Sequence, residues 1–324
     1  MTHAHPQEMD DRLETEASPP PEVASSETGG GAPEEATPRP ELSRRRIVFV
    51  AIVAVLVFII AIAAVIYGIG SLVHARDQRA LMATERTAIA NAAILDKALN
   101  QVKLPTKAPA QGSPVGVLAI PSLSINEVVV EGVGPSQTIS GPGHVPGTSG
   151  LGQAGNSGIV GRNAAYGGVF GQLGQLRPGD KVLTATIEGQ SVYVVRRVVT
   201  VAVGSLEPFY RATHNNRLTL VTSASNVPWN SGQAVVVTAV LRGKPYPATP
   251  QQIRDPGQLG NTGDDSAWIE LLLSVLGFAA IVLGALYLYR RCTIRSAYLL
   301  STAPLVAFIV LAAESISRLF PAWM

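Results

Sequence analysis

The chain has 324 residues, a formal net charge of +2 and a positive mean hydropathy. Charged residues make up 15% of it, against roughly 25% in soluble domains, while apolar residues reach 47%. This balance argues against a purely cytosolic enzyme and indicates membrane segments. The single cysteine, Cys292, excludes an intrachain disulfide, a Cys-ligated zinc site and a CxxC redox pair.

The first 43 residues are strongly acidic and contain almost no large apolar side chains. They hold ten Asp and Glu residues against two Arg, a net charge of −8, so the rest of the chain carries +10. Clusters of Pro and Gly interrupt the segment, and nothing in it could bury a core. We therefore predict a disordered acidic tail over residues 1–43.

Residues 44–70 are predicted to form the first transmembrane helix. Three consecutive Arg residues precede an uncharged run from Ile47 to Ile69, which exceeds the roughly 20 residues needed to cross a bilayer. A cleaved signal peptide would start nearer the first residue and have a shorter apolar core, so a retained anchor is favoured. The Arg cluster places the acidic tail in the cytoplasm.

Two further apolar runs close the chain, at 268–289 and 296–314, and predict a transmembrane hairpin. The loop between them, 290–295, holds three Arg residues, which favours the cytoplasmic side. Glu270 and Glu314 bound the runs, which are near the minimum spanning length, so a re-entrant hairpin is the alternative.

If all three segments span, the region from 70 to 267 and the C-terminal tail, 315–324, lie outside the cell. The outer region holds sixteen Lys and Arg against eleven Asp and Glu, without an aromatic-basic pattern for nucleic acid. The rings of Trp268 and Trp323 fit positions at the membrane interface.

Between the spans, the sequence predicts a stalk, two linkers and a β-rich domain. Residues 71–102 place apolar side chains at three- and four-residue spacing, which indicates an amphipathic stalk helix. Pro- and Gly-containing linkers follow at 103–114 and 243–267. Seven or eight short strands within 115–242 favour a compact barrel or sandwich over a βαβ fold. The expected strands are 115–121, 127–133, 157–161, 182–187, 191–203, 218–222 and 234–241.

The order of motifs across 115–242 resembles the sortase family, the cell-surface cysteine transpeptidases of Gram-positive bacteria. The motifs are the opening strand Gly116–Pro121, the glycine-rich loop Gly141–Thr148, the strand Gly155–Gly161, the pair Gly179-Asp180 and the Leu-Thr-Leu-Val-Thr strand, 218–222. The loop is most similar to the actinobacterial, class E-like branch. The resemblance implies a mainly β fold, a closed sortase-like barrel outside the membrane.

The resemblance also locates three catalytic positions, and all three carry other residues. The nucleophilic Cys corresponds to Ser223, the His to Arg162, and the Arg to Gln233 or to Ala234 one residue later. In the family, the Cys attacks a threonyl carbonyl of a sorting signal, the His exchanges the proton and the Arg stabilises the oxyanion.

These substitutions predict a site that is inert or nearly so. A serine hydroxyl is a weak nucleophile unless a base takes its proton, and the Arg162 guanidinium stays protonated with a pKa above about 12. Gln233 can donate one hydrogen bond but brings no positive charge. Losing such groups typically costs orders of magnitude in rate.

Other polar residues of the β-rich region are weaker candidates. His144 and His214 are its only histidines, and either reaching Ser223 would rebuild a Ser-His pair. We favour a structural loop position for His144 and a surface position for His214. Glu127 and Glu131 share a strand face, where calcium is conceivable, but a solvated face is favoured.

The expected function is therefore a binding or regulatory module at the plasma membrane of a Gram-positive-type cell. Its expected partners are sorting-signal peptides, cell-wall components or an active sortase, with no cofactor and no nucleic acid. The alternative is an active transpeptidase or hydrolase that uses Ser223 as nucleophile. A purely structural spacer is a third hypothesis. The enzyme requires a base within about 3 Å of the Ser223 hydroxyl, while the binding module requires none.

Overall fold

The computed structural model describes residues 44–99, 104–230, 232–255, 257–291 and 294–324. The acidic tail predicted over 1–43 and Cys292 lie outside these residues. The chain divides into two compact units, Met1–Val48 and Phe49–Met324, and the second holds the whole β-barrel.

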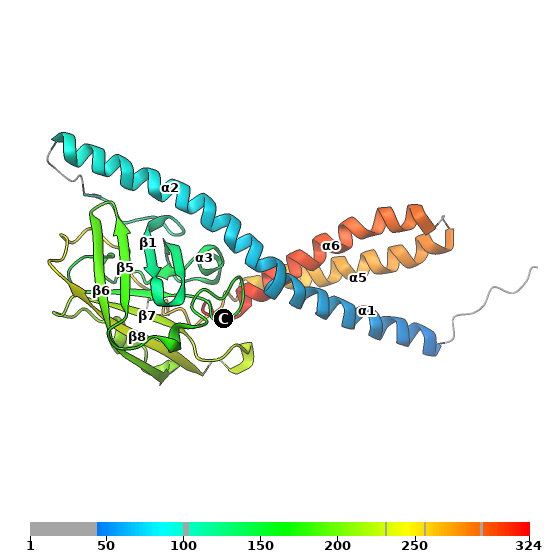
Figure 1. Ribbon diagram of the computed structural model, residues 1–324. Coiled ribbons are helices and arrows are strands. Elements are labelled where there is room, and N and C mark those ends of the chain that lie inside the picture. Colours follow the sequence, from blue (N-terminus) through cyan, green and yellow to red (C-terminus); the bar gives the residue numbers. More distant parts are fainter. Residues whose placement is uncertain (1–43, 100–103, 231, 256, 292–293) are drawn as a thin grey trace, which may run out of the picture. The chain divides into compact units, whose positions relative to one another are not determined.

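A long helical run leads to the barrel. The helix α1 (Arg44–Ala64) continues through a π-helical turn, Val65–Ile69, into α2 (Gly70–Leu99) (Figure 1). After its first three residues, all Arg, the sequence of α1 is apolar, as expected of a helix whose surroundings are apolar on all sides. In contrast, α2 alternates between polar and apolar faces, because one side meets the barrel and the other is exposed.

Polar side chains join α2 to the barrel. Gln78 Nε2 donates to the carbonyl oxygens of Val128 (3.1 Å) and Ser140 (2.7 Å), and its Oε1 accepts the Val128 N–H (2.7 Å). His74 lies 3.2 Å from Glu127. Gln78 and His74 lie on the same face of the helix as Leu81. Leu81 is one of the apolar residues whose spacing predicted this helix. The helix therefore packs along the barrel instead of standing free of it.

The domain outside the helices is a closed eight-stranded barrel, which confirms the expected fold. Its strand order is β1-β2-β3-β4-β7-β8-β6-β5, closed by pairing of β1 with β5. The strands are β1 (Pro114–Ile120), β2 (Ile125–Glu131), β3 (Gly143–His144), β4 (Asn156–Val160), β5 (Lys181–Thr186), β6 (Gly189–Ala202), β7 (Arg217–Ser223) and β8 (Gln233–Arg242). The sequence pattern missed β3, since two residues in a Gly- and Pro-rich loop show no alternation.

Short helices fill the connections between the strands. The barrel carries α3 (Pro135–Ser140) after β2 and α4 (Glu207–Tyr210) after β6. Each begins with a Pro in its first turn, where the missing N–H has no intrahelical partner to lose.

Alternate residues of the central strands face opposite sides of the barrel wall. Ile159 and Leu220 belong to the apolar cluster inside the barrel. Their neighbours in the chain, Val160 and Val221, belong to a second cluster, which alternation places on the outer face. Both faces of this part of the wall are therefore covered by apolar contacts.

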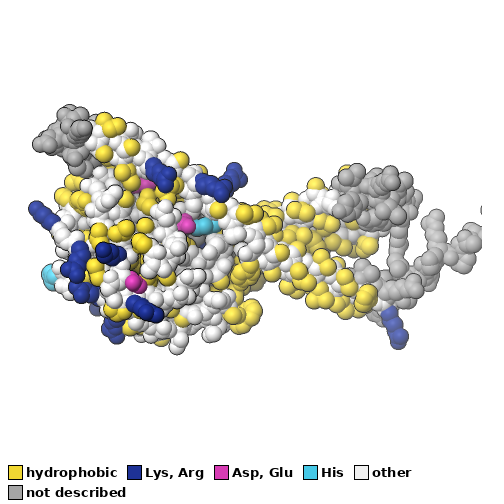
Figure 2. All heavy atoms as spheres, in the orientation of Figure 1, with side chains coloured by type: hydrophobic (Ala, Val, Ile, Leu, Met, Phe, Trp, Pro, Cys, Tyr) yellow, Lys and Arg dark blue, Asp and Glu magenta, His cyan; other side chains and the backbone are white. Residues whose placement is uncertain are grey.

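Two antiparallel helices end the chain, α5 (Ala267–Arg291) and α6 (Ile294–Leu319) (Figure 1). Three segments in the described chain are long and apolar enough to cross a membrane: Ala51–Ile94, Ala267–Leu288 and Leu300–Leu319. This confirms the expected apolar helices on both sides of the barrel. Figure 2 shows hydrophobic side chains exposed along the helices outside the barrel. Ile60 and Leu273 are among the exposed apolar residues.

Candidate active site

The barrel brings the ends of β4 and β7 together at the positions that the family resemblance singles out. The two strands are parallel, with Val160 opposite Val221, so Arg162 follows β4 beside the last residues of β7. The Gly161 N–H donates to the Val221 carbonyl (3.0 Å), and the Thr222 hydroxyl donates to the Gly161 carbonyl (2.9 Å). We call this region, with Arg162, Ser223 and the start of β8, the candidate site.

A glycine is required just before Arg162. A Cβ on Gly161 would lie 2.4 to 2.9 Å from atoms of the Phe170 ring, closer than real side chains approach. Phe170 in turn donates its N–H to the Arg162 carbonyl (2.9 Å). The backbone of the candidate site is thus fixed by a ring packed directly on it.

Ser223 is the last residue of β7 and is fully buried. Its hydroxyl donates to the Ser225 carbonyl (2.9 Å) and accepts the Ser225 N–H (3.2 Å). The Asn163 side-chain amide donates to the Ser223 carbonyl. Within residues 104–230 and 232–255, none of the hydrogen bonds of the Ser223 hydroxyl comes from a side chain that could act as a base.

Arg162 is buried and held by three oxygen atoms. Its Nη1 donates to the Ser317 hydroxyl (3.2 Å) and the Met324 carbonyl (3.2 Å), and its Nη2 donates to the Pro135 carbonyl (3.0 Å). The guanidinium carbon lies 5.1 Å from the centroid of the Tyr166 ring. Such contacts compensate a buried cation that has no Asp or Glu partner among the described residues.

The electrostatics of Arg162 agree with a structural cation. Burial lowers the pKa of Arg162 to about 10, an effect that Tyr166 partly opposes. The guanidinium therefore stays protonated at neutral pH and cannot take a proton from Ser223.

The position that corresponds to the family's Arg is less well defined than those of Ser223 and Arg162. Gln233 is the first residue of β8 and is exposed, while Ala234 is fully buried and directly opposite Ser223. Strand alternation puts Ala234, not Gln233, on the face of Val221 and Ser223. Neither Gln233 nor Ala234 supplies a cation at this end of β8.

Neither histidine of the barrel is hydrogen-bonded to Ser223. His144 is buried on β3, with Nδ1 2.8 Å from Glu131 Oε2 and Nε2 2.9 Å from the Ser149 carbonyl. His214 is exposed in the connection before β7. The expectation of a solvated strand face is wrong for Glu131, because that carboxylate is fully buried against His144.

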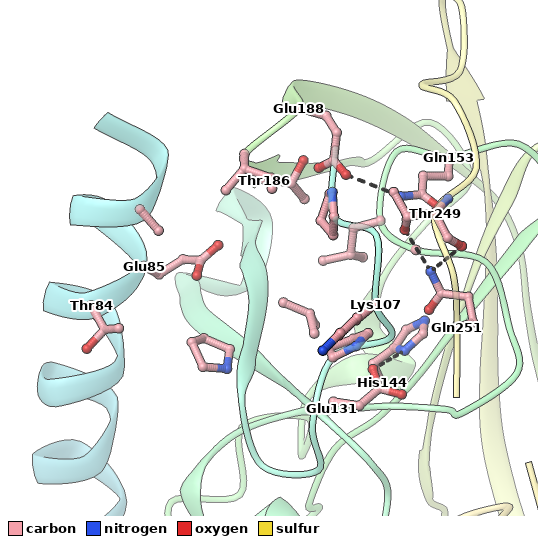
Figure 3. A pocket seen from close by; sticks show the side chains of 18 residues that line it. Thr84, Glu85, Lys107, Glu131, His144, Gln153, Thr186, Glu188, Thr249 and Gln251 are labelled. Atoms are coloured by element: carbon pink, nitrogen blue, oxygen red, sulfur yellow. Dashed lines mark hydrogen bonds and ion pairs between the residues drawn. The ribbon is translucent and has the colours of Figure 1, made fainter. Parts of the chain in front are cut away.

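The Glu131–His144 pair borders a cavity of about 280 Å³ between α2 and the barrel (Figure 3). Glu85 of α2 and Lys107 also line it, but none of the three candidate catalytic residues does. Within the described residues, no group of three His, Cys, Asp or Glu side chains is arranged to hold a metal ion.

The C-terminal segment supplies residues that sequence reasoning did not assign to the candidate site. Trp323 and Met324 pack with an outer cluster of barrel residues, which we call the candidate-site cluster: Val133, Val145, Val160, Leu206, Tyr210, Val221, Ala234 and Val236. Trp323 is fully buried, so its expected place at the membrane interface is wrong. A tryptophan shortly after an apolar helix gives the same local sequence pattern whether its ring lies at a membrane interface or is buried against the protein.

Comparison with known proteins identifies the barrel. Residues 118–242 match the family model of the sortase domain. Among curated proteins, none matches the chain. The closed barrel agrees with this match and has the sortase fold, and the flanking apolar helices suggest membrane anchoring.

Solved structures of sortases are also similar to part of the chain. A sortase D5 transpeptidase from Clostridium perfringens is 18% identical, with 50% of this chain and 99% of that chain covered and a TM-score of 0.39. Sortase E from Streptomyces avermitilis is 27% identical, with coverage of 42% and 93% and a TM-score of 0.37. Sortase A from Listeria monocytogenes is 21% identical, with coverage of 46% and 94% and a TM-score of 0.36.

Proposed function

We propose that this protein is a membrane-anchored sortase-fold module that binds peptides at the cell surface without cleaving them. The observation that carries the proposal is the bonding of Ser223 and Arg162. The hydroxyl at the nucleophile position is paired with Ser225, and the residue at the base position is a protonated guanidinium with its own hydrogen-bond partners.

Catalysis by the family's route needs three functions that these residues do not supply. A base must take the nucleophile's proton, the nucleophile must be accessible, and a cation or several N–H donors must stabilise the oxyanion. Ser223 is fully buried, Arg162 cannot accept a proton, and Gln233 is uncharged. The fold of a peptide-processing family without its chemistry supports a role in binding.

The proposed topology follows from charge. The Arg residues at 44–46 and in the loop 290–295 favour the cytoplasmic side of the membrane, which puts the acidic tail inside and the barrel outside. The glycine-rich loop 141–148 supports assignment to the class E-like branch. The proposed partners are sorting-signal peptides, cell-wall components or an active sortase.

The test uses the full chain in lipid nanodiscs, incubated with a panel of sorting-signal peptides and an amine acceptor. Intact-mass spectrometry detects a cleaved peptide or an acyl adduct, and fluorescence anisotropy of labelled peptides measures binding. We expect binding without product. A product that Ser223→Ala abolishes would show a serine transpeptidase and overturn the proposal, and the absence of any bound peptide would also contradict it.

A further inference from the structure

The C-terminal segment lies on the candidate site in the manner of a bound peptide. The Asn163 N–H donates to the Trp323 carbonyl (2.8 Å), and Arg162 donates to the Met324 carbonyl (3.2 Å). Two consecutive carbonyls of the segment are thus bound by two consecutive residues of the barrel. Backbone recognition of this kind depends little on side chains and suits a peptide ligand.

The side chain of Trp323 supplies the apolar part of the contact. It is fully buried in the candidate-site cluster, whose members include Val160 at the end of β4 and Val221 on β7. Ala234, directly opposite Ser223 in the sheet, belongs to the same cluster. The ring therefore covers the wall of the barrel beside the nucleophile position.

The local structure after α6 directs the C-terminal segment to the candidate site. The helix α6 ends at Leu319, and Pro321, which cannot continue a helix, follows two residues later. The Met324 N–H donates to the Pro321 carbonyl (3.1 Å), so the four residues Pro321–Met324 form a tight turn. Near the end of α6, Arg318 binds the Asp264 carboxylate (2.7 Å) and positions the start of the segment.

We propose that Pro321–Met324 is a built-in occupant of the candidate site, and that a peptide partner binds there only by displacing it. The inference rests on the proposed binding function and adds its regulation and the type of ligand. The site accepts a turn in which a small residue precedes a buried aromatic ring and consecutive carbonyls face Arg162 and Asn163.

The indole N–H of Trp323 further restricts the type of peptide that the site can bind. Within the described residues, its indole N–H is buried without a hydrogen-bond partner. The site therefore uses the ring for its apolar area and provides no acceptor for the N–H, so a phenylalanine fits in its place. A partner peptide with Pro-Ala-Phe should bind at least as well as one with Pro-Ala-Trp.

Covalent attachment makes the segment a strong competitor. A segment that follows a helix after a few residues has an effective concentration on the order of millimolar at a site within its reach. A free peptide of similar intrinsic affinity then binds the intact chain weakly. A substitution that weakens binding of the attached segment to the candidate site should raise the apparent affinity for the free peptide.

The first experiment measures whether Trp323 is covered. The other two tryptophans, Trp229 and Trp268, are 87% and 62% exposed, so replacing both by Phe leaves Trp323 as the only indole in the full chain. In nanodiscs, acrylamide should quench its fluorescence weakly, and adding excess Leu-Phe-Pro-Ala-Phe-Met peptide should increase the quenching. A matched variant that keeps only Trp229 should be quenched strongly throughout. Equal quenching of the two variants without peptide would overturn the proposal.

The second experiment measures competition with a fluorescein-labelled Leu-Phe-Pro-Ala-Phe-Met peptide. Because truncation of a buried Trp is among the costliest core substitutions, we expect Trp323→Ala to bind this peptide roughly a hundredfold more tightly than the wild type. Trp323→Phe should stay close to the wild type, and Trp268→Ala, on exposed α5, is the matched control. An unchanged affinity of Trp323→Ala would contradict displacement.

The two proposals fail in different ways. A Ser223-dependent product in the peptide assay would overturn the non-catalytic function and leave the occupancy of the site intact. Strong quenching of Trp323 without peptide would overturn the occupancy and leave the non-catalytic function intact.

Discussion

Arg162 donates a hydrogen bond to the backbone carbonyl of Pro135, 3.0 Å away, and so joins the end of β4 to the first turn of α3. The same guanidinium reaches Ser317 and Met324. One buried cation therefore connects three segments that are far apart in the sequence. Arg162 is therefore a residue that holds the structure together.

Replacing Arg162 should destabilise the protein according to how much of the side chain is lost. Arg162→Ala leaves three oxygen acceptors without their donor and opens a cavity, and we expect a loss of about 2–4 kcal/mol. Arg162→Met keeps most of the volume and removes the buried charge, so its loss should be clearly smaller. Chemical unfolding of the full chain in micelles measures both. Equal stability of the wild type and Arg162→Ala would contradict the structural role.

A cysteine at position 223 should be protected from thiol reagents. In a Cys292→Ser background, Ser223→Cys places a thiol at a fully buried position, where burial also disfavours the reactive thiolate. The exposed neighbour Gln233→Cys is the matched control and should be labelled quickly. Mass spectrometry after timed treatment with a maleimide gives both rates. Similar rates at the two positions would show that the candidate site is open.

Gly161→Ala should destabilise the barrel, since the added methyl group would overlap the Phe170 ring. Overpacking of this kind typically costs about 1–3 kcal/mol. Gly204→Ala is the control, because a Cβ there meets no atom within 4 Å and the backbone does not need a glycine. We expect Gly204→Ala to be neutral or slightly stabilising. If the thermal midpoints of the two variants agree, the close packing on Gly161 is wrong.

Gln78→Ala should loosen α2 from the barrel. The substitution leaves the Val128 N–H and two carbonyls without their partner, at a cost of about 2–3 kcal/mol. Hydrogen exchange of the Val128 amide is the direct readout, since that N–H is donated to Gln78. Arg79→Ala, the exposed next residue, should leave the exchange rate unchanged. Unchanged protection in Gln78→Ala would show that the helix is not held by these bonds.

Acid should weaken the attachment of the C-terminal segment through Asp264. Hydrogen bonds from Ser266 and Arg318 hold the pKa of Asp264 below its ordinary value of about 3.9. The carboxylate therefore contributes stability above pH 4, and this contribution is lost as the pH falls through the lowered pKa. Asp264→Asn should unfold more easily than the wild type at pH 6, and the difference should vanish in stronger acid. A difference independent of pH would exclude the carboxylate as its cause.

Much of the barrel could be predicted from the sequence because its strands carry local signals. The alternation of Leu218 and Leu220 with Thr219 and Val221 marks β7, whose last residue is Ser223. In the structure, Arg162 follows the neighbouring strand β4 and lies beside the end of β7. It was harder to predict which residue of β8 faces Ser223. The choice between Gln233 and Ala234 depends on the strand register, which only the pairing with β7 fixes.

The rest of the site depends on contacts between distant segments. Nothing near Trp323 in the sequence distinguishes a ring at a membrane interface from a ring buried on a barrel 160 residues away along the chain, as its bond with Asn163 shows. The burial of Glu131 against His144 is similar, since an acid on a strand normally indicates a solvated face. A local sequence pattern indicates only the average preference of a residue. The burial of Trp323 and Glu131 is determined by tertiary packing.

The closed strand order has a consequence for how partners can be recognised. Each described strand has a neighbour on both sides in the closed order, but β2 and β4 each meet the short strand β3 over only two residues. Extension of the sheet by a partner strand is therefore confined to the unpaired parts of β2 and β4 that flank β3. Specificity must come from loops, strand ends and the helices packed on them, and these elements can diverge while the barrel keeps its form.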